Sequence, residues 1–381
     1  MIYFDNSATT AVLPKAAETA QSYMTREYFN PAAAYSAAVN TERAVSGARA
    51  VLAENLSAEP SEVFFTSCGT ESNNTALFGS LRALPANRRS GRVLISAAEH
   101  PSVYEAAMDL KEAGWDVRLI PVDITGRVVL SELEALVTPE TRLVSVMHVN
   151  NESGAVNDIS AIYALVKKKS PACLVHSDGV QAFMKLPPVK CDMYSVSGHK
   201  LHAPKGIGAL LIRKGVRVKP YLIGGGQEQG MRSGTSNVPS IMAFSEAVRD
   251  FSENREAYMS GIFAVKSRLY GNLTRIKDVI LNGPELSEAA PHILNMSFMG
   301  VRGEVLLNAL SEKGLCVSTG SACAAHKRGK NRILNAMGIT GDRQDGAIRF
   351  SFSHFNTAEE ADTASQLIED ELKLLRRFRR R

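Results

Sequence analysis

Short apolar runs alternate with amphipathic stretches through the first half of the chain. The apolar runs cover residues 62–67, 92–97, 117–122, 143–149 and 173–178. Helical spacing of apolar positions falls between them, at residues 73–84, 101–114, 131–137 and 159–169. Near-continuous apolar strands separated by helices are typical of a mostly parallel sheet with helices on both faces. The pattern therefore predicts an α/β fold.

The pattern changes after about residue 250. A long helical stretch covers residues 253–273, and an apolar run follows at 293–298. A helix is expected at 304–314, a strand at 348–353, and an amphipathic helix at the end of the chain. We expect a large domain at residues 15–255 and a smaller α+β domain built from residues 1–14 and 256–381.

Polar residues follow the predicted strands at the points where the strands end. In sheets of this kind, ligands gather outside the carboxyl ends of the strands. We therefore expect one site there, and this convergence weighs more than any single motif. The residues that follow four of the strands are Gly69-Thr70-Glu71, Glu99-His100, Asn150-Asn151-Glu152 and Asp178 to Gln181.

Charge narrows the expected partners. The 381 residues carry a formal net charge of +5, and the last six residues, RRFRRR, contain five arginines. The rest of the chain is therefore electrically balanced. A basic run can contact nucleic acid, but a frayed, solvated terminus is the more ordinary interpretation. We expect no direct nucleic-acid partner.

Cysteine usage and the ends of the chain indicate the compartment. Five cysteines without a CxxC pair argue against a disulfide framework and against a zinc site. The N-terminus shows no secretory signal, and no apolar run reaches the ~18 residues of a membrane helix. We expect a cytoplasmic protein in a reducing environment.

The stretch SVSGHKLHAPKGIG places Lys200 in a turn rich in small residues. A lysine in a loop is most often a surface charge, but an amine held rigidly and partly desolvated can attack a carbonyl compound. Ser197 and His199 beside it could bind a phosphate. Lys200 is therefore a candidate nucleophile.

Three other positions each allow two interpretations. Asp178 could hold a proton on a pyridine nitrogen or cap a helix. Gly69 and Thr70 could bind an anion at a helix start, or Thr70 could simply cap it. His100 could stack on an aromatic cofactor and move protons, or be a hydrogen-bonded histidine at a strand end. In isolation, capping and the ordinary histidine would be the better interpretations of Thr70 and His100.

Nine short motifs occur in the order found in a known enzyme family, and this resemblance decides between the alternatives. Each is weak alone, but in register they make the chain resemble cysteine desulfurases of the NifS/IscS type. These are pyridoxal-phosphate enzymes of the aspartate-aminotransferase fold, related to class V aminotransferases. The motifs are DNSATT (5–10), TSCGTESNN (66–74), AEHPSV (98–103), MHVNNESG (147–154), HSDGVQ (176–181), SGHKLHAPKGIG (197–208), GGGQEQGMRSGT (224–235), STGSAC (318–323) and IRFSFS (348–353).

The resemblance implies a role for each site residue. Lys200 corresponds to the lysine that binds pyridoxal 5′-phosphate covalently, and His100 to the residue stacked on its ring. Asp178 would pair with the ring nitrogen and Gln181 with the ring 3-oxygen, while Asn151 would lie beside the ring and contact substrate. The residues expected to hold the phosphate or line its site are Gly69, Thr70, Ser197, Gly198 and His199, with Thr235 supplied by the neighbouring subunit of a homodimer. Arg349 would bind the substrate carboxylate, a task suited to bidentate pairing.

Cys323 completes the expected machinery. It lies in the small, polar stretch STGSACAAHKRGKN, and the basic residues that follow would favour its thiolate. The resemblance implies that it takes sulfur from L-cysteine as a persulfide, releases L-alanine, and passes the sulfur to iron–sulfur cluster assembly or tRNA thiolation. We interpret Cys68, Cys173 and Cys316 as buried apolar residues, and Cys191 as inert.

The chain departs from the family near its N-terminus. The family often has NPSS followed by a histidine and a glycine, whereas this chain has NPAAAYSAAVN, with Tyr35 and Ala38 at those places. We infer altered packing rather than lost chemistry. Three alternatives remain on the same fold: a selenocysteine lyase, a class V aminotransferase, and a silent sulfur-delivery subunit.

Overall fold

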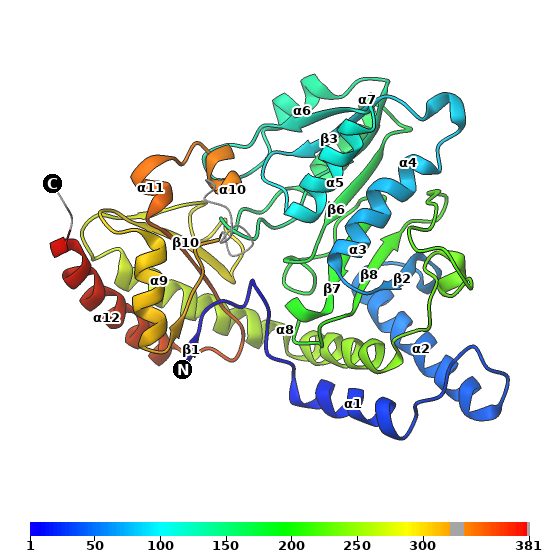
Figure 1. Cartoon of the computed structure of the whole chain (residues 1–381), viewed down its shortest axis with the longest axis horizontal. Coiled ribbons are helices and arrows are strands. Elements are labelled where there is room, and N and C mark those ends of the chain that lie inside the picture. Colours follow the sequence, from blue (N-terminus) through cyan, green and yellow to red (C-terminus); the bar gives the residue numbers. More distant parts are fainter. Residues whose placement is uncertain (321–330, 379–381) are drawn as a thin grey trace.

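The computed structural model describes residues 1–320 and 331–378. A large lobe and a small lobe are joined by one long helix, α8 (Val238–Leu273), which runs beneath both (Figure 1). The two lobes are organised around different sheets, one of seven strands and one of three.

The large lobe confirms the predicted α/β fold with a mostly parallel sheet. Its strand order is β2-β8-β7-β6-β5-β3-β4, and β8 alone runs antiparallel to its neighbours. In chain order the strands are β2 (Val63–Thr66), β3 (Arg92–Ser96), β4 (Asp116–Ile120), β5 (Thr141–Ser145), β6 (Leu174–Asp178), β7 (Met193–Ser197) and β8 (Gly208–Ile212).

Both faces of this sheet are buried because successive apolar side chains point to opposite sides. On β3, Leu94 packs with one cluster and Val93 and Ile95 with the other. The Leu94 face is covered by α1 (Pro14–Thr25), α2 (Ser36–Asn55), α6 (Leu130–Leu136), α7 (Ile159–Lys169) and the first part of α8. The opposite face is covered by α5 (Pro101–Glu112) and the run α3 (Gly69–Asn74), η2 (Thr75–Gly79) and α4 (Ser80–Arg82).

The small lobe has a core of its own. Its antiparallel sheet has the order β12-β10-β9, and a short parallel pair joins β1 to β11. The strands are β1 (Ile2–Tyr3), β9 (Val279–Leu281), β10 (Ile293–Phe298), β11 (Leu315–Cys316) and β12 (Ala347–Ser351), with α9 (Gly303–Glu312), α10 (Arg332–Ala336), α11 (Gly341–Asp345) and α12 (Ala358–Leu375) around them.

Helix α8 contributes to both cores. Its residues up to Phe251 pack in the large lobe, whereas those from Ile262 onward pack in the small lobe. The division at residues 255 and 256 stays a prediction. The expected helix at 253–273 is too short, because the helix begins at Val238, where the Asn237 side chain accepts a hydrogen bond from the Ser240 amide.

Two further differences from the expected elements have local causes. The strand expected at 143–149 ends at Ser145, and the Asn150 carboxamide accepts from the amides of Glu152 and Ser153 to make a turn. The predicted strands did not include β7 or β8. Strand β7 carries polar residues at buried positions, and the Ser195 hydroxyl is satisfied by a 2.9 Å hydrogen bond with His176 Nε2.

Candidate active site

Lys200 ends the short turn η4 (Gly198–Lys200) that follows β7. Its amine donates to the carbonyl oxygens of Ser7 and Ala8, the second at 2.6 Å. Gly198 permits the tight turn, since a Cβ there would lie 2.8 Å from the Ile207 side chain. The amine is therefore half-buried and fixed at the carboxyl edge of the sheet, as the surrounding small residues suggested.

The N-terminal segment forms a strap over this turn. Thr10 donates from its amide and its hydroxyl to the His199 carbonyl, and its hydroxyl accepts from the His202 amide. Gln181 Nε2 donates to the Ser7 carbonyl at 3.0 Å. Sequence reasoning identified DNSATT as a motif but missed this positioning role, because residues 5–10 are distant from Lys200 along the chain.

A chain of hydrogen bonds joins Asp178 to His100. Asn73 Nδ2 donates to Asp178 Oδ2 at 2.7 Å and to the Ser102 hydroxyl at 2.8 Å. The Ser102 oxygen lies 2.8 Å from His100 Nδ1. Asp178 Oδ1 also accepts from the Val180 amide at 2.9 Å. Asn73 and Ser102 were not among the predicted site residues, although TSCGTESNN and AEHPSV contain them.

The tautomer of His100 follows from its position as the N-cap of α5. Its Nδ1 accepts from the Ser102 backbone amide at 3.1 Å, so the ring proton of the neutral imidazole lies on Nε2. Burial lowers the pKa of His100; Lys200 and Arg332 lower it further, while Asp178 opposes them. His100 therefore caps α5 and also faces charged groups of the site, while its stacking on a cofactor ring stays a prediction.

The expected phosphate-binding residues surround the start of α3. Ser197 is buried with a hydroxyl oxygen that has no partner among the described residues. Gly69 opens α3, and a Cβ there would lie 2.6 Å from the Val180 side chain. Thr70 is exposed beside it. His199 Nδ1 lies 3.3 Å from the Thr9 hydroxyl, and burial followed by nearby lysines lowers the pKa of His199 to about 4.

Arg349 on β12 is buried between two carboxylates. It donates to Asp5 at 2.8 Å and to Glu152 at 3.0 Å, and its Nε has no partner among the described residues. Burial raises the pKa of Glu152 to about 7, while Arg349 opposes this rise and Asp5 adds to it. Arg349 also donates to the Asn151 carbonyl at 3.0 Å, which ties the expected substrate ligand to the residue expected beside the ring.

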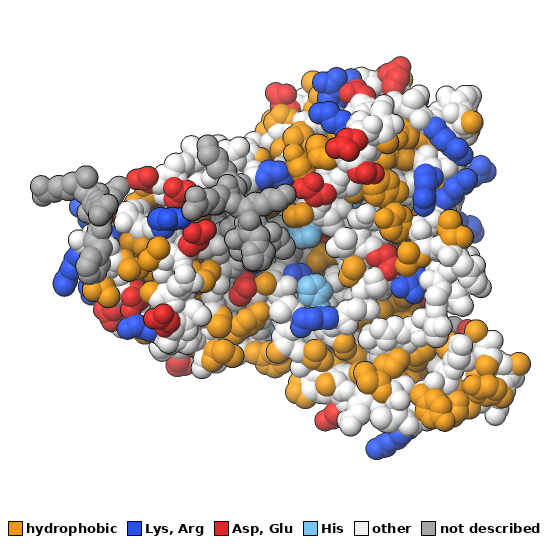
Figure 2. Space-filling model, in the orientation of Figure 1, with side chains coloured by type: hydrophobic (Ala, Val, Ile, Leu, Met, Phe, Trp, Pro, Cys, Tyr) orange, Lys and Arg blue, Asp and Glu red, His pale blue; other side chains and the backbone are white. Residues whose placement is uncertain are grey.

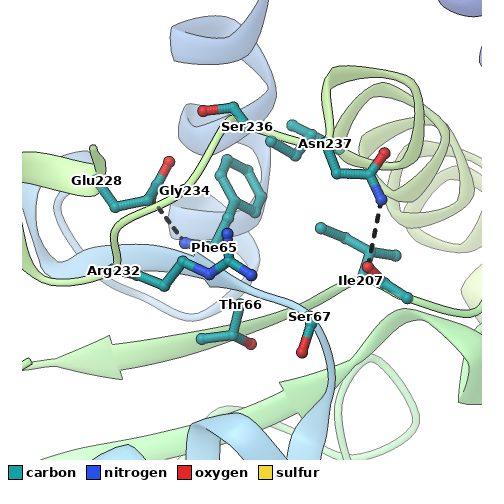
Figure 3. A pocket seen from close by; sticks show the side chains of 11 residues that line it. Phe65, Thr66, Ser67, Ile207, Glu228, Arg232, Gly234, Ser236 and Asn237 are labelled. Carbon is teal, nitrogen blue, oxygen red and sulfur yellow. Dashed lines mark hydrogen bonds between the residues drawn. The ribbon is translucent and has the colours of Figure 1, made fainter. Parts of the chain in front are cut away.

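Thr235 is exposed, between Gly234 and Ser236. The loop that carries it is anchored by two ion pairs: Glu228 with Arg49 at 2.6 Å and Arg232 with Glu71 at 3.1 Å. Figure 3 shows that this loop and the end of β2 line a cavity of about 30 Å³, with Arg232, Gly234 and Asn237 on one side and Thr66 on the other.

The cysteines have different environments. Cys323 and the basic residues after it lie outside the described residues. Cys173 and Cys191 are buried, and burial raises the pKa of each thiol to about 12. The expectation that Cys68 and Cys316 are buried is wrong, because both are half-buried.

No cluster of His, Cys, Asp or Glu able to hold a metal is found in the described part of the chain. Histidine and basic side chains gather where the two lobes meet (Figure 2). Within residues 1–320 and 331–378, no helix combines the length and apolar character that crossing a membrane demands.

The chain was compared with known proteins. The family described as aminotransferase class-V matches residues 2–363. A cysteine desulfurase of Nostoc sp. is 37% identical over 381 residues, covering 99% of this chain and 94% of the relative. The cysteine desulfurase IscS of Klebsiella pneumoniae is 38% identical over 384 residues, covering 98% and 93%. A solved NifS-like protein has a TM-score of 0.92 at 37% identity, covering 98% of this chain and 100% of its own.

Burial of histidines predicts acid sensitivity. A group whose pKa falls on folding takes up protons in the unfolded state first, so stability is lost as pH falls below about 6.5. Glu99 and Glu152, whose pKa values burial raises, oppose this in the same window, but they are fewer. The seven described histidines, all with lowered pKa, are His100, His148, His176, His199, His202, His292 and His354.

We expect the free energy of unfolding to be lower at pH 5.5 than at pH 7.5 by roughly 3 kcal/mol or more. Urea titrations of protein freed of bound ligands measure it, because a ligand bound to the folded state adds stability of its own. Equal unfolding midpoints at the two pH values would show that these histidines are not held neutral.

Proposed function

The chain belongs to the aminotransferase class-V family and is a cysteine desulfurase that uses pyridoxal 5′-phosphate, and we propose that the polar residues at the carboxyl edge of the large sheet carry its reaction. The observation that supports this most is the Lys200 amine, held at the carbonyls of Ser7 and Ala8 in a turn that follows a buried strand. The resemblance to NifS/IscS-type enzymes is confirmed by the relatives and by the solved fold.

The described residues fit this cofactor. The buried oxygens Ser197 Oγ and Asn151 Oδ1 have no partner within the described chain, as expected of groups that meet a ligand. The first turn of α3 offers backbone N–H groups that a helix leaves unpaired, and an anion is stabilised there. Gly69 lets the backbone of that turn pack closely against Val180 and Ser197, because a Cβ there would lie 2.6 Å from the Val180 side chain.

Each residue then has a proposed task toward the cofactor. Lys200 would hold it covalently. Asp178, which accepts hydrogen bonds from the Asn73 side chain and the Val180 amide, would keep the ring nitrogen protonated. His100 would stack on the ring and Gln181 would face the 3-oxygen. Thr70, Ser197 and His199 would hold the phosphate beside Gly69 and Gly198. When bound, this group serves as an electron sink for carbanion chemistry.

The chain's own residues supply the proton and binding steps. Lys200, once released from the cofactor, would remove the proton from the α-carbon of L-cysteine, for which a partly desolvated amine is suited. Asn151 would orient the substrate. Arg349 would pair with the substrate carboxylate through two parallel hydrogen bonds.

Protonation of Glu152 would let Arg349 exchange this carboxylate for that of the substrate. Two carboxylates share one buried guanidinium, and the pKa of Glu152 is raised to about 7. Near neutral pH this carboxyl therefore takes up a proton readily and leaves one side of Arg349 for the incoming substrate. Arg349 keeps its contact with Asp5, which fixes its orientation.

Cys323 would accept the sulfur. Its thiolate bonds to the substrate sulfur while the Cβ–S bond breaks, and the electron pair of that bond stays on Cβ. Cβ would then take up a proton, and Lys200 would return the proton to the α-carbon, so that the product leaves as L-alanine. The sulfur remains on Cys323 as a persulfide. A class V aminotransferase would need no such thiol, and the relatives named here are cysteine desulfurases. Selenocysteine lyase and aminotransferase are therefore the less favoured assignments.

We propose a homodimer in which Thr235 completes the partner's phosphate site. Thr235 is exposed on a loop held by the Glu228 and Arg232 ion pairs, so a second copy could reach it. Large apolar side chains are exposed nearby along the chain, among them Ile223 at 83%. A second copy would cover them.

The sulfur acceptor is proposed from the relatives. One relative carries the name IscS, and we propose that the persulfide of this chain supplies iron–sulfur cluster assembly or tRNA thiolation. The described cysteines are free thiols, which supports a reducing, cytoplasmic location.

The substitution Cys323→Ala tests the function. We expect it to retain bound cofactor but to release no sulfide from L-cysteine, because the cofactor residues are untouched and the sulfur acceptor is gone. Visible absorbance and a sulfide assay measure the two properties. Cys316→Ala, a half-buried thiol on β11, is the matched control and should stay active. Turnover of Cys323→Ala at the parent rate would exclude this role.

Co-expression of two inactive variants tests the dimer. Lys200→Ala lacks the amine, and Thr235→Asp would place a negative charge against the partner's phosphate. A mixed dimer contains one site with both native residues, so we expect about a quarter of the parent activity from random pairing. The activity of each variant alone is the control. A mixture no more active than their sum would show that Thr235 does not act across subunits.

A further inference from the structure

Arg332 bridges the small lobe and the loop that leads to His100. It opens α10, whose start is fixed by Asn331 Oδ1 accepting from the amides of Ile333 and Leu334. Its guanidinium donates to the carbonyl of Ala97 at 2.5 Å and to the carbonyl of Glu99. Two carbonyls within one loop are thus bound by one rigid, planar fork, whereas a lysine ammonium is a point charge on a more flexible stem.

The same guanidinium is placed over an aromatic ring. Its carbon lies 3.9 Å from the centroid of Tyr104, on the helix α5 that His100 caps. A cation over a ring face is attracted by the ring quadrupole, and more strongly where water is excluded. Arg332 therefore contacts the loop before His100 and the helix after it.

The loop at residues 97–99 is held from the other side as well. Asn150 Nδ2 donates to the Ala98 carbonyl at 2.9 Å, and the Met147 amide donates to Glu99 Oε1 at 2.6 Å. Ala98 also packs with Ile333, Leu334 and Met337 in a small apolar cluster. The β3–α5 loop is therefore clamped between residues 147–150 and α10.

We propose that Arg332 is a positioning residue for His100: by binding the Ala97 and Glu99 carbonyls and the Tyr104 ring, it fixes the loop from which His100 faces Lys200 and Asp178. This rests on the proposed role of His100 beside the cofactor ring. A shift of this loop would move the imidazole relative to the reacting centre, where small displacements cost rate.

Arg332 also contributes charge to the surroundings of His100. The groups that face the imidazole are Asp178 from β6, Lys200 and His199 from η4, and Arg332 from α10. Of these, Asp178 raises the pKa of His100, while Lys200 and Arg332 lower it. Loss of the guanidinium should therefore raise the pKa of His100, which a merely structural role would not do.

Three variants separate the fork from the charge. Arg332→Met removes both, Arg332→Lys keeps the charge, and Arg302→Met removes an exposed arginine as the matched control. The first readout is NMR titration of the imidazoles in histidine-labelled protein, with the His100 signal assigned by its loss in His100→Gln. The second is kcat and KM for alanine release by the holoenzyme at matched cofactor content.

We expect the His100 midpoint to rise by roughly half to one pH unit in Arg332→Met and to stay near the parent in Arg332→Lys. We expect kcat to fall about tenfold or more in both variants with little change in KM, since neither restores the two-carbonyl fork. The proposal requires both effects in folded protein, and a parent-like midpoint or a parent-like kcat in Arg332→Met overturns it. If the parent itself forms no L-alanine, the proposed function fails, while the NMR titration still decides whether Arg332 acts on His100.

Discussion

The site depends on one contact: the amine of Lys200 against the carbonyl oxygens of Ser7 and Ala8. An amine in this half-buried turn needs acceptors in place of water, and the N-terminal strap supplies them. The strap is in turn held by Thr10 at the His199 carbonyl and by Gln181 at Ser7. Residues 7–10 and residues 181–200, which are far apart in the sequence, therefore hold the reactive turn together. The absence of a side chain at Gly198 allows the turn to pack closely against Ile207.

Burial influences the protonation of the ionisable groups in the site as much as ion pairs and hydrogen bonds do. Asp178 accepts two N–H donors and stays an acceptor at the end of β6. Arg349 pairs with two carboxylates, and burial raises the pKa of Glu152 although Arg349 opposes the rise. His100 and His199 are held toward the neutral form, so each can donate or accept one hydrogen bond near pH 7. Different residues of the site are therefore suited to proton transfer and to anion binding.

Much of this was predictable because it depends on local pattern. The alternating apolar runs predicted the α/β sheet, and Lys200 lies in a tight turn, as its small neighbours predicted. Asn73, Ser102 and the strap were missed, since their roles arise from contacts between segments distant in sequence. Strand β7 was missed because its buried serines are satisfied only across the sheet, as Ser195 is by His176. Helix α8 was predicted short because the missed residues 238–252 pack in the large-lobe core, whereas the predicted residues 253–273 lead into the small-lobe core.

The most direct measurement is the site of covalent cofactor attachment. Holoenzyme treated with borohydride, digested and analysed by mass spectrometry should carry the reduced pyridoxyl group on the peptide containing Lys200. Lys185 and Lys205 lie close by in sequence and serve as internal comparisons, because the Lys185 amine instead binds the Lys200 carbonyl at 3.1 Å. The label on Lys200 alone is the result predicted. Label on another lysine, or none on holoenzyme with full activity, would contradict the account.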